Sequence, residues 1–485
     1  MTSVAKTSVA KPSVDPTGLA APPPQHAAPA FTTLPLSPAM QANLQRLGYL
    51  AMTPIQAASL PLALAGRDLI AQAKTGSGKT VAFSLPLLTR LDPRRLEVQA
   101  LVLCPTRELA EQVTQEIRRL ARAEDNVRAL SLCGGVPLRG QLTSLAHGAH
   151  VVVGTPGRLL DHLSRGSLAL TALNTLVLDE ADRMLDMGFA EDIAKVVEAF
   201  PAERQTLLFS ATWPDGVTRL ARRFMRDAQE VKLAERHAAT KIRQRFYEVD
   251  ETTRLHAVGL LLEHFRPAST LAFCNTKQQC RDLVAVLQAQ GFVALELHGD
   301  LEQRERDQVL VQFANRSCSV LVATDVAARG LDIAQLEAVI NVDIPSDAEV
   351  YTHRIGRTGR ADEAGWAFSL ASLDEMGQVG RIDEMQGRPS EWHALAELTA
   401  AVGAAPLRPP MATLQLAGGR KEKIRAGDVL GALTKDLGLQ GAQVGRIVVN
   451  DFATYVAVER SVADQALRGL NAGKVKGRSV KAKRL

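Results

Sequence analysis

A glycine-rich loop is the first segment of this sequence that could do chemistry. Residues 73–80 read Ala-Lys-Thr-Gly-Ser-Gly-Lys-Thr, after an apolar run at 68–71 and before a helical pattern. This is the context of a phosphate-binding loop, although Ala73 replaces the usual first glycine. Its glycines let backbone N–H groups turn toward a β-phosphate, the lysine reaches the β- and γ-phosphates, and the last hydroxyl can ligate Mg²⁺. We therefore expect ATP and Mg²⁺ as cofactors, bound by Thr75, Gly76, Ser77, Gly78, Lys79 and Thr80.

Two adjacent acids follow an apolar run at 175–178. At the carboxyl edge of a parallel sheet, Asp179 would hold the Mg²⁺ shell and Glu180 would orient or deprotonate the attacking water. Two acids after a strand can also simply begin a solvated helix. The phosphate loop earlier in the chain favours the catalytic interpretation.

Arginines that could reach the same phosphates lie much later in the chain. Residues 353–360 read His-Arg-Ile-Gly-Arg-Thr-Gly-Arg, so Arg357 and Arg360 share one face of a helix and could stabilise charge on a γ-phosphate. A basic stretch on its own is more often a solvated surface. Because this region has no phosphate loop of its own, we interpret the pair as arginine fingers acting on the phosphate site formed by residues 73–80.

Short apolar runs must position these residues. They alternate with helical patterns, and occur at 100–103, 151–153, 175–178 and 206–209, then at 271–273, 294–297, 320–323 and 338–342. Runs that are apolar throughout are typical of parallel strands buried on both faces. The rhythm predicts two tandem α/β lobes, at 31–228 and 236–385.

The remaining composition restricts the class of protein. Residues 1–30 have no apolar period and are predicted to be disordered, and 386–410 read as a proline-containing linker. Five scattered cysteines suggest neither zinc nor disulfides. With no signal-peptide pattern and no apolar run of membrane-spanning length, we expect a cytoplasmic protein that does not contact membranes. The linker has no room for an obvious dimerisation domain, so we expect a monomer.

The last segment is basic and has a folded pattern. Residues 411–485 carry 14 Lys and Arg against 6 Asp and Glu, a net of +8, whereas the residues before them sum to −3. Such an excess attracts phosphate backbones, although a solubilising tail would have the same charge. Segments at 411–416, 425–433, 444–449, 455–458, 462–470 and 479–483 give the order β-α-β-β-α-β. This is the plan of a small RRM-like α+β domain.

The expected RNA contacts of this domain come from its loops. Ala453 and Val458 stand where an RRM sheet would carry stacking aromatics, so the sequence gives little support for RNA binding by the sheet face. Base stacking by Tyr455 stays open. The candidates are the cations of two loops, namely Arg420, Lys421, Lys423, Lys474, Lys476 and Arg478.

Taken together, residues 31–385 resemble the DEAD-box RNA helicases, whose core is two RecA-like lobes. The stretch 48–56 is similar to their Q motif, with Met52 in place of the usual proline. The resemblance implies that Phe31 stacks on adenine, that Gln56 reads its edge and that Asp332 lies near the ribose. It also implies that ATP state is coupled to unwinding through Asp182, Ser210, Thr212 and His353.

RNA contacts in the core are likewise implied by the resemblance. The residues are Pro105, Thr106, Arg107, Gly135, Thr155 and Arg158 in the first lobe, and Gln303, Arg306 and Thr324 in the second. Hydroxyl, guanidinium and glycine N–H groups suit this role, because they bind phosphate and 2′-hydroxyl without reading bases.

The C-terminal domain resembles that of the DbpA subfamily in its Gly-Gly-Arg-Lys loop and its Lys-x-Lys-Gly-Arg ending. This implies a specific partner, a hairpin of 23S ribosomal RNA engaged during assembly of the large (50S) ribosomal subunit. The expected function is ATP-dependent unwinding of short RNA duplexes at that site. The alternatives are a general RNA helicase, a nucleotide-dependent RNA clamp without rRNA specificity, and a helicase acting on DNA.

Overall fold

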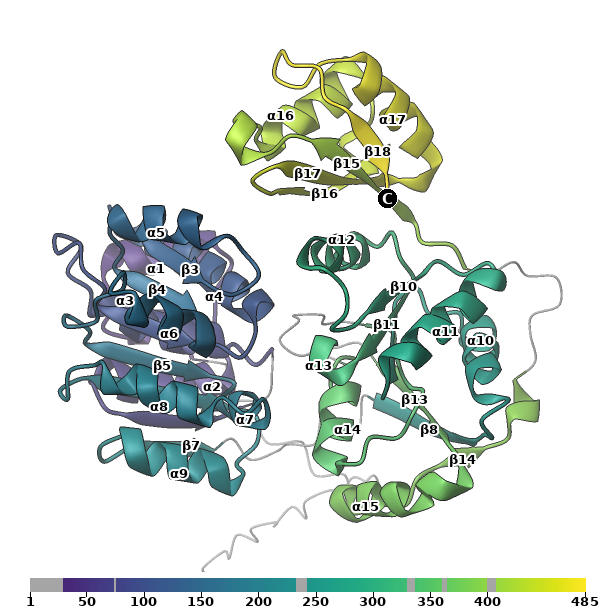
Figure 1. Cartoon of the computed structure of the whole chain (residues 1–485), viewed down its shortest axis with the longest axis horizontal. Helices are drawn as coiled ribbons and strands as arrows, with labels where there is room; N and C mark the ends of the chain where they lie inside the picture. Colours follow the sequence, from purple (N-terminus) through teal and green to yellow (C-terminus); the bar gives the residue numbers. More distant parts are fainter. Residues whose placement is uncertain (1–28, 74–75, 233–241, 329–335, 360–363, 399–406) are drawn as a thin grey trace, which may run out of the picture.

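Two parallel sheets and one antiparallel sheet make up the protein in the computed structural model, which describes residues 29–73, 76–232, 242–328, 336–359, 364–398 and 407–485. Each parallel sheet has seven strands and is covered by helices on both faces, and the antiparallel sheet has four. Figure 1 shows the first lobe, the second lobe and the C-terminal domain as three bodies, each built around its own sheet. The predicted fold class is confirmed.

The first lobe has the strand order β3-β4-β2-β5-β6-β1-β7. Its strands are β1 (Leu69–Gln72), β2 (Ala100–Leu103), β3 (Ala129–Leu132), β4 (Val151–Gly154), β5 (Thr175–Asp179), β6 (Gln205–Ser210) and β7 (Gln229–Lys232). Its helices are α1 (Pro38–Arg46), α2 (Pro54–Leu64), α3 (Lys79–Thr89), α4 (Arg107–Leu120), α5 (Leu138–Ala146), α6 (Pro156–Ser164), α7 (Ala181–Asp186), α8 (Ala190–Glu198) and α9 (Asp215–Phe224). Because β7 pairs with β1, the lobe runs past the predicted boundary at 228.

The second lobe has the order β10-β11-β9-β12-β13-β8-β14. Its strands are β8 (Ile242–Glu248), β9 (Thr270–Cys274), β10 (Ala294–Leu297), β11 (Val320–Thr324), β12 (Ala338–Asn341), β13 (Gly365–Ala371) and β14 (Trp392–His393). Its helices are α10 (Arg254–Phe265), α11 (Lys277–Ala289), α12 (Gln303–Ala314), α13 (Asp325–Ala328), α14 (Ala348–Ile355) and α15 (Met376–Gln386). Since β14 pairs with β8 and Leu398 packs in the core, the lobe extends through 398, well into the predicted linker at 386–410.

The C-terminal domain has the order β16-β17-β15-β18, with all neighbours antiparallel. Its elements are β15 (Met411–Ala417), α16 (Ala426–Gly431), a π-helical turn (Ala432–Asp436), β16 (Val444–Val449), β17 (Ala453–Glu459), α17 (Ala463–Ala472) and β18 (Ala482–Arg484). Both helices lie on one face of the sheet, as Figure 1 shows. The predicted β-α-β-β-α-β order is therefore present.

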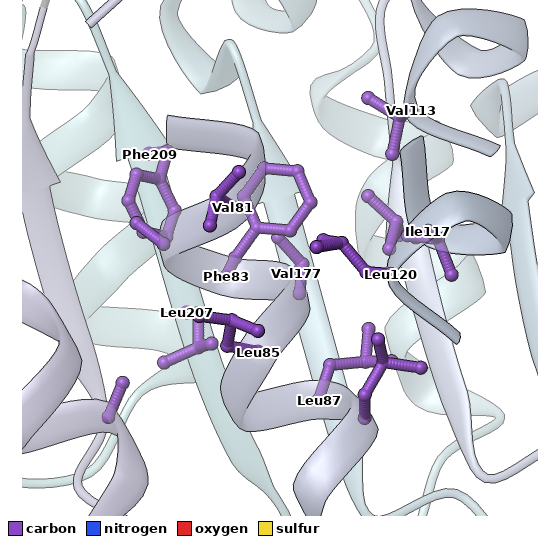
Figure 2. Packing of buried hydrophobic residues seen from close by; sticks show 14 of the residues in the cluster. Val81, Phe83, Leu85, Leu87, Val113, Ile117, Leu120, Val177, Leu207 and Phe209 are labelled. Carbon is purple, nitrogen blue, oxygen red and sulfur yellow. The ribbon is translucent and has the colours of Figure 1, made fainter. Parts of the chain in front are cut away.

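The helix that follows the phosphate loop is held by a continuous apolar core. Figure 2 shows Phe83, Leu85 and Leu87 of α3 packed between α4 and the strands β5 and β6. The rings of Phe83 and Phe209 meet edge to face, with centroids 5.4 Å apart. Buried side chains of this size each contribute about 1.5–3 kcal/mol relative to exposure, so the N-terminus of α3 has a rigid support.

Candidate active site and nucleic-acid interface

The phosphate loop turns into α3 through a glycine that no other residue could replace without strain. Gly78 caps the helix with φ 96°, in the left-handed region. A Cβ atom on Gly78 would lie 2.5 Å from Nε2 of Gln56. Gly76 also has a positive φ, of 80°. Of the predicted loop residues, Thr75 lies outside the described part of the chain.

Gln56 ties the loop to the helix that precedes the first strand. Thr53 and Gln56 form a capping box at the start of α2, in which the Gln56 Oε1 atom accepts from the Thr53 N–H at 2.9 Å. The Nε2 atom of Gln56 donates to the Gly78 carbonyl at 3.1 Å. Sequence reasoning assigned Gln56 to adenine alone, and the structure adds this bracing of the loop.

Phe31 lies in the hydrophobic core of the first lobe, 4% exposed, with its ring 6.4 Å from that of Tyr49. In this arrangement very little of the ring is open to a nucleotide. Stacking of Phe31 on adenine stays a prediction.

Lys79 and Asp179 form the charged centre of the site. Both are buried, and among the described residues neither Lys79 Nζ nor Asp179 Oδ1 has a hydrogen-bond partner. Burial raises the pKa of Asp179 to about 7, against the opposing charge of Lys79. A buried ammonium and a buried carboxylate oxygen that have no protein partner can bind a phosphate chain and the Mg²⁺ that accompanies it. Thr80, the other predicted Mg²⁺ ligand, is the second residue of α3.

Glu180 is held in an uncommon backbone conformation by its place at the N-terminus of α7. Its φ is 52°, in the left-handed region, and its side chain is 3% exposed. Arg183 lies three residues on, with its Nη1 3.1 Å from Glu180 Oε2 and only 5% of its side chain exposed. Arg183 was not among the predicted site residues. The i to i+3 spacing on a helix was the one available signal for this contact.

Helix α7, which contains Asp182, is joined to the end of strand β6 by a network of hydrogen bonds. The Asp182 Oδ2 atom accepts from the Thr212 N–H and Oγ1, both at 2.8 Å, and from the Ala211 N–H at 3.2 Å. The Asp182 N–H donates to Ser210 Oγ at 3.3 Å. Burial pushes the pKa of Asp182 up, but the Thr212 hydrogen bonds and the Lys79 charge bring it below its usual range. Three of the four predicted coupling residues, Asp182, Ser210 and Thr212, are thus in direct contact.

The second lobe presents α14 to this network. Glu349 lies close to the Thr212 hydroxyl, which itself donates to Asp182, and a small pocket between the lobes is lined by Arg183 and Asp186 on one side and His353 and Arg357 on the other. Arg357 is buried at 5% exposure. It faces the first lobe, as an arginine finger must. Arg360 and Asp332, also predicted for the nucleotide site, lie outside the described residues.

Arg354, which sequence reasoning passed over, is the structural anchor of this region. Its guanidinium is 1% exposed and pairs with Asp325 at 2.6 Å. It also donates to the Asp343 carbonyl at 2.7 Å and to Asn275 Oδ1 at 3.1 Å. This residue therefore fixes α14 to the carboxyl ends of β9 and β12.

His353 should make the contact between the lobes sensitive to acid. Burial, with a further contribution from Arg183, lowers the pKa of His353 to about 4. When the lobes separate, the pKa returns toward its usual value of about 6.5, so the separated state binds more protons between these limits. Acidification through this window is expected to separate the lobes. Energy transfer between dyes on the two lobes, recorded as a function of pH, measures the separation. His353→Gln should weaken the change in energy transfer at acid pH. The same pH dependence in both proteins would contradict the role of His353.

Most predicted RNA contacts of the core lie where strands of the two sheets end. Thr106 and Thr155 are the N-cap residues of α4 and α6, and Gly135 follows β3 with φ 74°. Thr324 ends β11, and Gln303 and Arg306 lie in the first turn of α12. Pro105 is buried, and Arg158 donates to Gln141 Oε1 at 2.8 Å, so both also have structural contacts.

In this structure two of the predicted RNA ligands, Arg107 and Arg306, each contact a carboxylate of the opposite lobe. Arg306 Nη2 lies 3.2 Å from Glu108 Oε1, and Arg107 Nη2 lies 3.6 Å from Asp307 Oδ2. Two carboxylates thus occupy the arginines that the resemblance assigns to phosphates. RNA phosphates would compete with these carboxylates for the two arginines.

Glu108→Gln should therefore strengthen RNA binding in the absence of nucleotide. The substitution keeps the shape of the side chain and removes a charge that competes with phosphate for Arg306. We expect about threefold tighter binding, corresponding to about 0.7 kcal/mol of lost ion pairing. Fluorescence anisotropy with a short single-stranded RNA measures the effect. Glu97→Gln, which removes the same charge from an exposed pair with Arg95, is the control; unchanged or weaker binding by Glu108→Gln would oppose the explanation.

The basic loops of the C-terminal domain lie together. Lys476 Nζ donates to the Lys423 carbonyl at 2.6 Å and lies 3.6 Å from Asp428. Lys423 and Lys476 both have left-handed φ values, of 61° and 53°. In the loop at 418–423, Arg420 pairs with Asp451 at 2.9 Å, and both side chains are more than half exposed. Two segments that are about fifty residues apart in the sequence thus form one cationic surface with Lys421, Lys474 and Arg478.

Comparison with known proteins decides the family. Residues 53–220 match the DEAD/DEAH box helicase domain, 253–362 the helicase conserved C-terminal domain, and 413–484 the DbpA RNA binding domain. The ATP-dependent RNA helicase DbpA of Escherichia coli is 51% identical over 457 residues, which are 94% of this chain and 99% of that protein. The chain belongs to the DEAD-box ATP-dependent RNA helicases, in the DbpA subfamily.

Other relatives agree over the helicase core. The DEAD-box ATP-dependent RNA helicase CshA of Geobacillus kaustophilus is 44% identical over 74% of this chain and 77% of its own length. The structure of S. cerevisiae Dbp5 bound to RNA and ADP BeF3 superposes with a TM-score of 0.68 at 30% identity, covering 76% of this chain and 97% of that one. This DEAD-box helicase therefore has the subfamily's RNA-binding domain on a core common to the family.

Proposed function

We propose that this helicase unwinds short duplexes next to a hairpin of 23S ribosomal RNA during assembly of the large ribosomal subunit. The observation that carries the proposal is the cationic surface formed by the 418–423 and 474–478 loops within a DbpA RNA binding domain. Cations on loops, rather than aromatics on a sheet, favour a folded RNA with closely spaced phosphates. The printed name of the E. coli relative says only that it is an ATP-dependent RNA helicase.

The chain's own residues suggest how ATP would drive the cycle. Lys79, Thr80 and Asp179 would hold the phosphates and Mg²⁺, which supplies charge neutralisation when bound. Glu180 would take a proton from water, with Arg183 fixing its orientation. Arg357 would complete the site from the second lobe, so that tight ATP binding requires the lobes to be together. The Asp182 network then links this contact to Thr212 and, through Glu349, to helix α14 of the second lobe.

A nucleotide-dependent RNA clamp is the second candidate. It would use the same lobes and release RNA without unwinding it. Glu180 and Arg357 at the interface favour hydrolysis over a static clamp. We further infer a monomeric protein of 52.2 kDa that acts in the cytoplasm, where such RNA is assembled. Among the described residues, no helix has the length and apolar character needed to span a bilayer.

Binding selectivity tests the target. We would replace Lys474, Lys476 and Arg478 by alanine, and compare this variant with one in which Lys435, Arg446 and Arg468 are replaced. Both lose three positive charges from the same domain, and the second set is exposed elsewhere on it. Selection of a 23S hairpin fragment over unrelated RNA of equal length should fall at least tenfold in the first variant only, because three phosphate contacts are lost. Equal losses would mean that the domain supplies charge alone.

A further inference from the structure

The C-terminal sheet has one face on its own helices and a second face that is also buried. Leu414, Leu416 and Val456 pack into the domain core against α16 and α17. The residues between them must point the other way, because side chains alternate along a strand. Yet Thr413 is 0% exposed, Gln415 is 7% and Tyr455 is 3%. Something outside the domain covers this outer face.

The second lobe provides the cover. Thr413 Oγ1 lies 3.1 Å from Asn315 Nδ2 and 2.6 Å from Ser317 Oγ. Gln308 Nε2 donates to Gln415 Oε1 at 3.4 Å, and the Gln308 side chain also lies close to the Tyr455 hydroxyl. Figure 1 shows the sheet side of the domain turned toward α12, with α16 and α17 on the far side. Base stacking by Tyr455, left open by the sequence, is absent from this arrangement because the ring is buried at the interface.

One helix therefore has two surfaces. The first turn of α12 has Gln303 and Arg306, which face the first lobe and the predicted RNA path. Gln308, five residues after Gln303 and two after Arg306, faces the C-terminal sheet. An α-helix is stiff over such a distance, so a domain docked on α12 keeps a fixed distance and angle to the RNA ligands of the core.

We propose that the outer face of the C-terminal sheet is a docking surface for α12, and that Gln308 is a positioning residue that holds the domain on the helicase core. The face that RRM-type sheets use for bases is thus occupied by the chain itself. RNA held by the cationic loops is presented to the core at one spacing, instead of anywhere within reach of a flexible tether. This inference rests on the proposed function only in its use of the loops as the RNA site.

The geometry of the domain is tested first, in the full-length chain. Dyes would be attached at Gln278→Cys on α11 and Gln465→Cys on α17, both exposed, since all five native cysteines are buried. Gln308→Glu with Gln415→Glu places two like charges across the contact, and Gln308→Glu with Gln415→Lys places opposite charges there. A narrow distance distribution is expected for the unmodified and the opposite-charge proteins, and a broad one for the like-charge protein. A broad distribution in the unmodified protein would overturn the docking.

Function is tested with the same variants and no dyes. The substrates are a 23S hairpin fragment joined to a short duplex through single-stranded spacers of increasing length. The like-charge protein should bind the hairpin with unchanged affinity but unwind the duplex at the optimal spacing roughly tenfold more slowly, with a flatter dependence on spacing. The opposite-charge protein should recover both properties. Unchanged unwinding and spacing dependence in a protein with a broadened distance distribution would overturn the positioning role.

The two proposals fail in different ways. If the loops do not select this RNA, the unmodified protein will show no preference for the hairpin, while the distance distributions still decide whether the sheet is docked. If docking is absent, the preference for the hairpin remains and the spacing dependence is flat in every variant.

Discussion

Glu180→Gln should lower the turnover number for RNA-stimulated ATP hydrolysis by about 10²- to 10⁴-fold, the usual contribution of a general base. The amide keeps the size of the buried side chain but cannot accept a proton from water. Nucleotide binding should persist, because Lys79 and Asp179 are untouched. The turnover number comes from a coupled assay at saturating ATP and RNA, and binding comes from titration with a fluorescent ATP analogue.

The control for this substitution is Glu191→Gln, an exposed acid on α8 that should leave turnover unchanged. Hydrolysis by Glu180→Gln within about threefold of the unmodified protein would contradict the role of Glu180. Loss of nucleotide binding together with hydrolysis would instead indicate that losing the ion pair with Arg183 disturbs the fold of α7.

Asp325→Ala should destabilise the second lobe by about 3–5 kcal/mol, because it leaves the buried guanidinium of Arg354 without its ionic partner. Unfolding in urea followed by tryptophan fluorescence measures the change. In a Trp213→Phe background the two remaining tryptophans, Trp366 and Trp392, both report on the second lobe.

Asp282→Ala on the exposed surface of α11 serves as the control, with an expected change within about 0.5 kcal/mol. A loss below about 1 kcal/mol for Asp325→Ala would mean that the neutral partners of Arg354, Asn275 and the Asp343 carbonyl, suffice to hold it.

The sequence alone predicted many strands of the two lobes because those buried parallel strands are apolar along their whole length, but it gave no run at β3, β7, β8 or β13. The predicted run at 100–103 coincides with β2, and those at 151–153 and 206–209 fall inside β4 and β6. The end of the second lobe was placed too early for a related reason. Strand β14 has two residues, Trp392 and His393, and a pair cannot display a period.

Contacts between distant parts of the chain were beyond sequence reasoning. The residue types and spacing identified Arg306 as a ligand for phosphate, but nothing local to it points to Glu108, nearly two hundred positions earlier. The same holds for Gln308 and its partner Gln415 in another domain. Such pairs arise from the way the lobes and the C-terminal domain pack, and this packing is fixed by many contacts that no single segment encodes.

The sequence predicted the side chains that act on the nucleotide, but it did not predict the neighbouring side chains that hold them in place. Lys79, Asp179 and Glu180 were found from their types and their places after strands. The contacts that orient the loop and the catalytic acid, from Gln56 to Gly78 and from Arg183 to Glu180, were not predicted. These side chains act on a neighbouring protein group, and a residue in such a role has no motif of its own.

Steady-state ATP hydrolysis by the full-length protein tests the central claim most directly. Turnover would be measured without RNA, with 23S ribosomal RNA, and with unrelated RNA of equal length at the same salt concentration. A site-directed DEAD-box helicase predicts low activity without RNA, strong stimulation by 23S RNA and much weaker stimulation by the unrelated RNA, with the preference lost when Lys474, Lys476 and Arg478 are replaced. Equal stimulation by both RNAs would contradict a helicase directed to one ribosomal site.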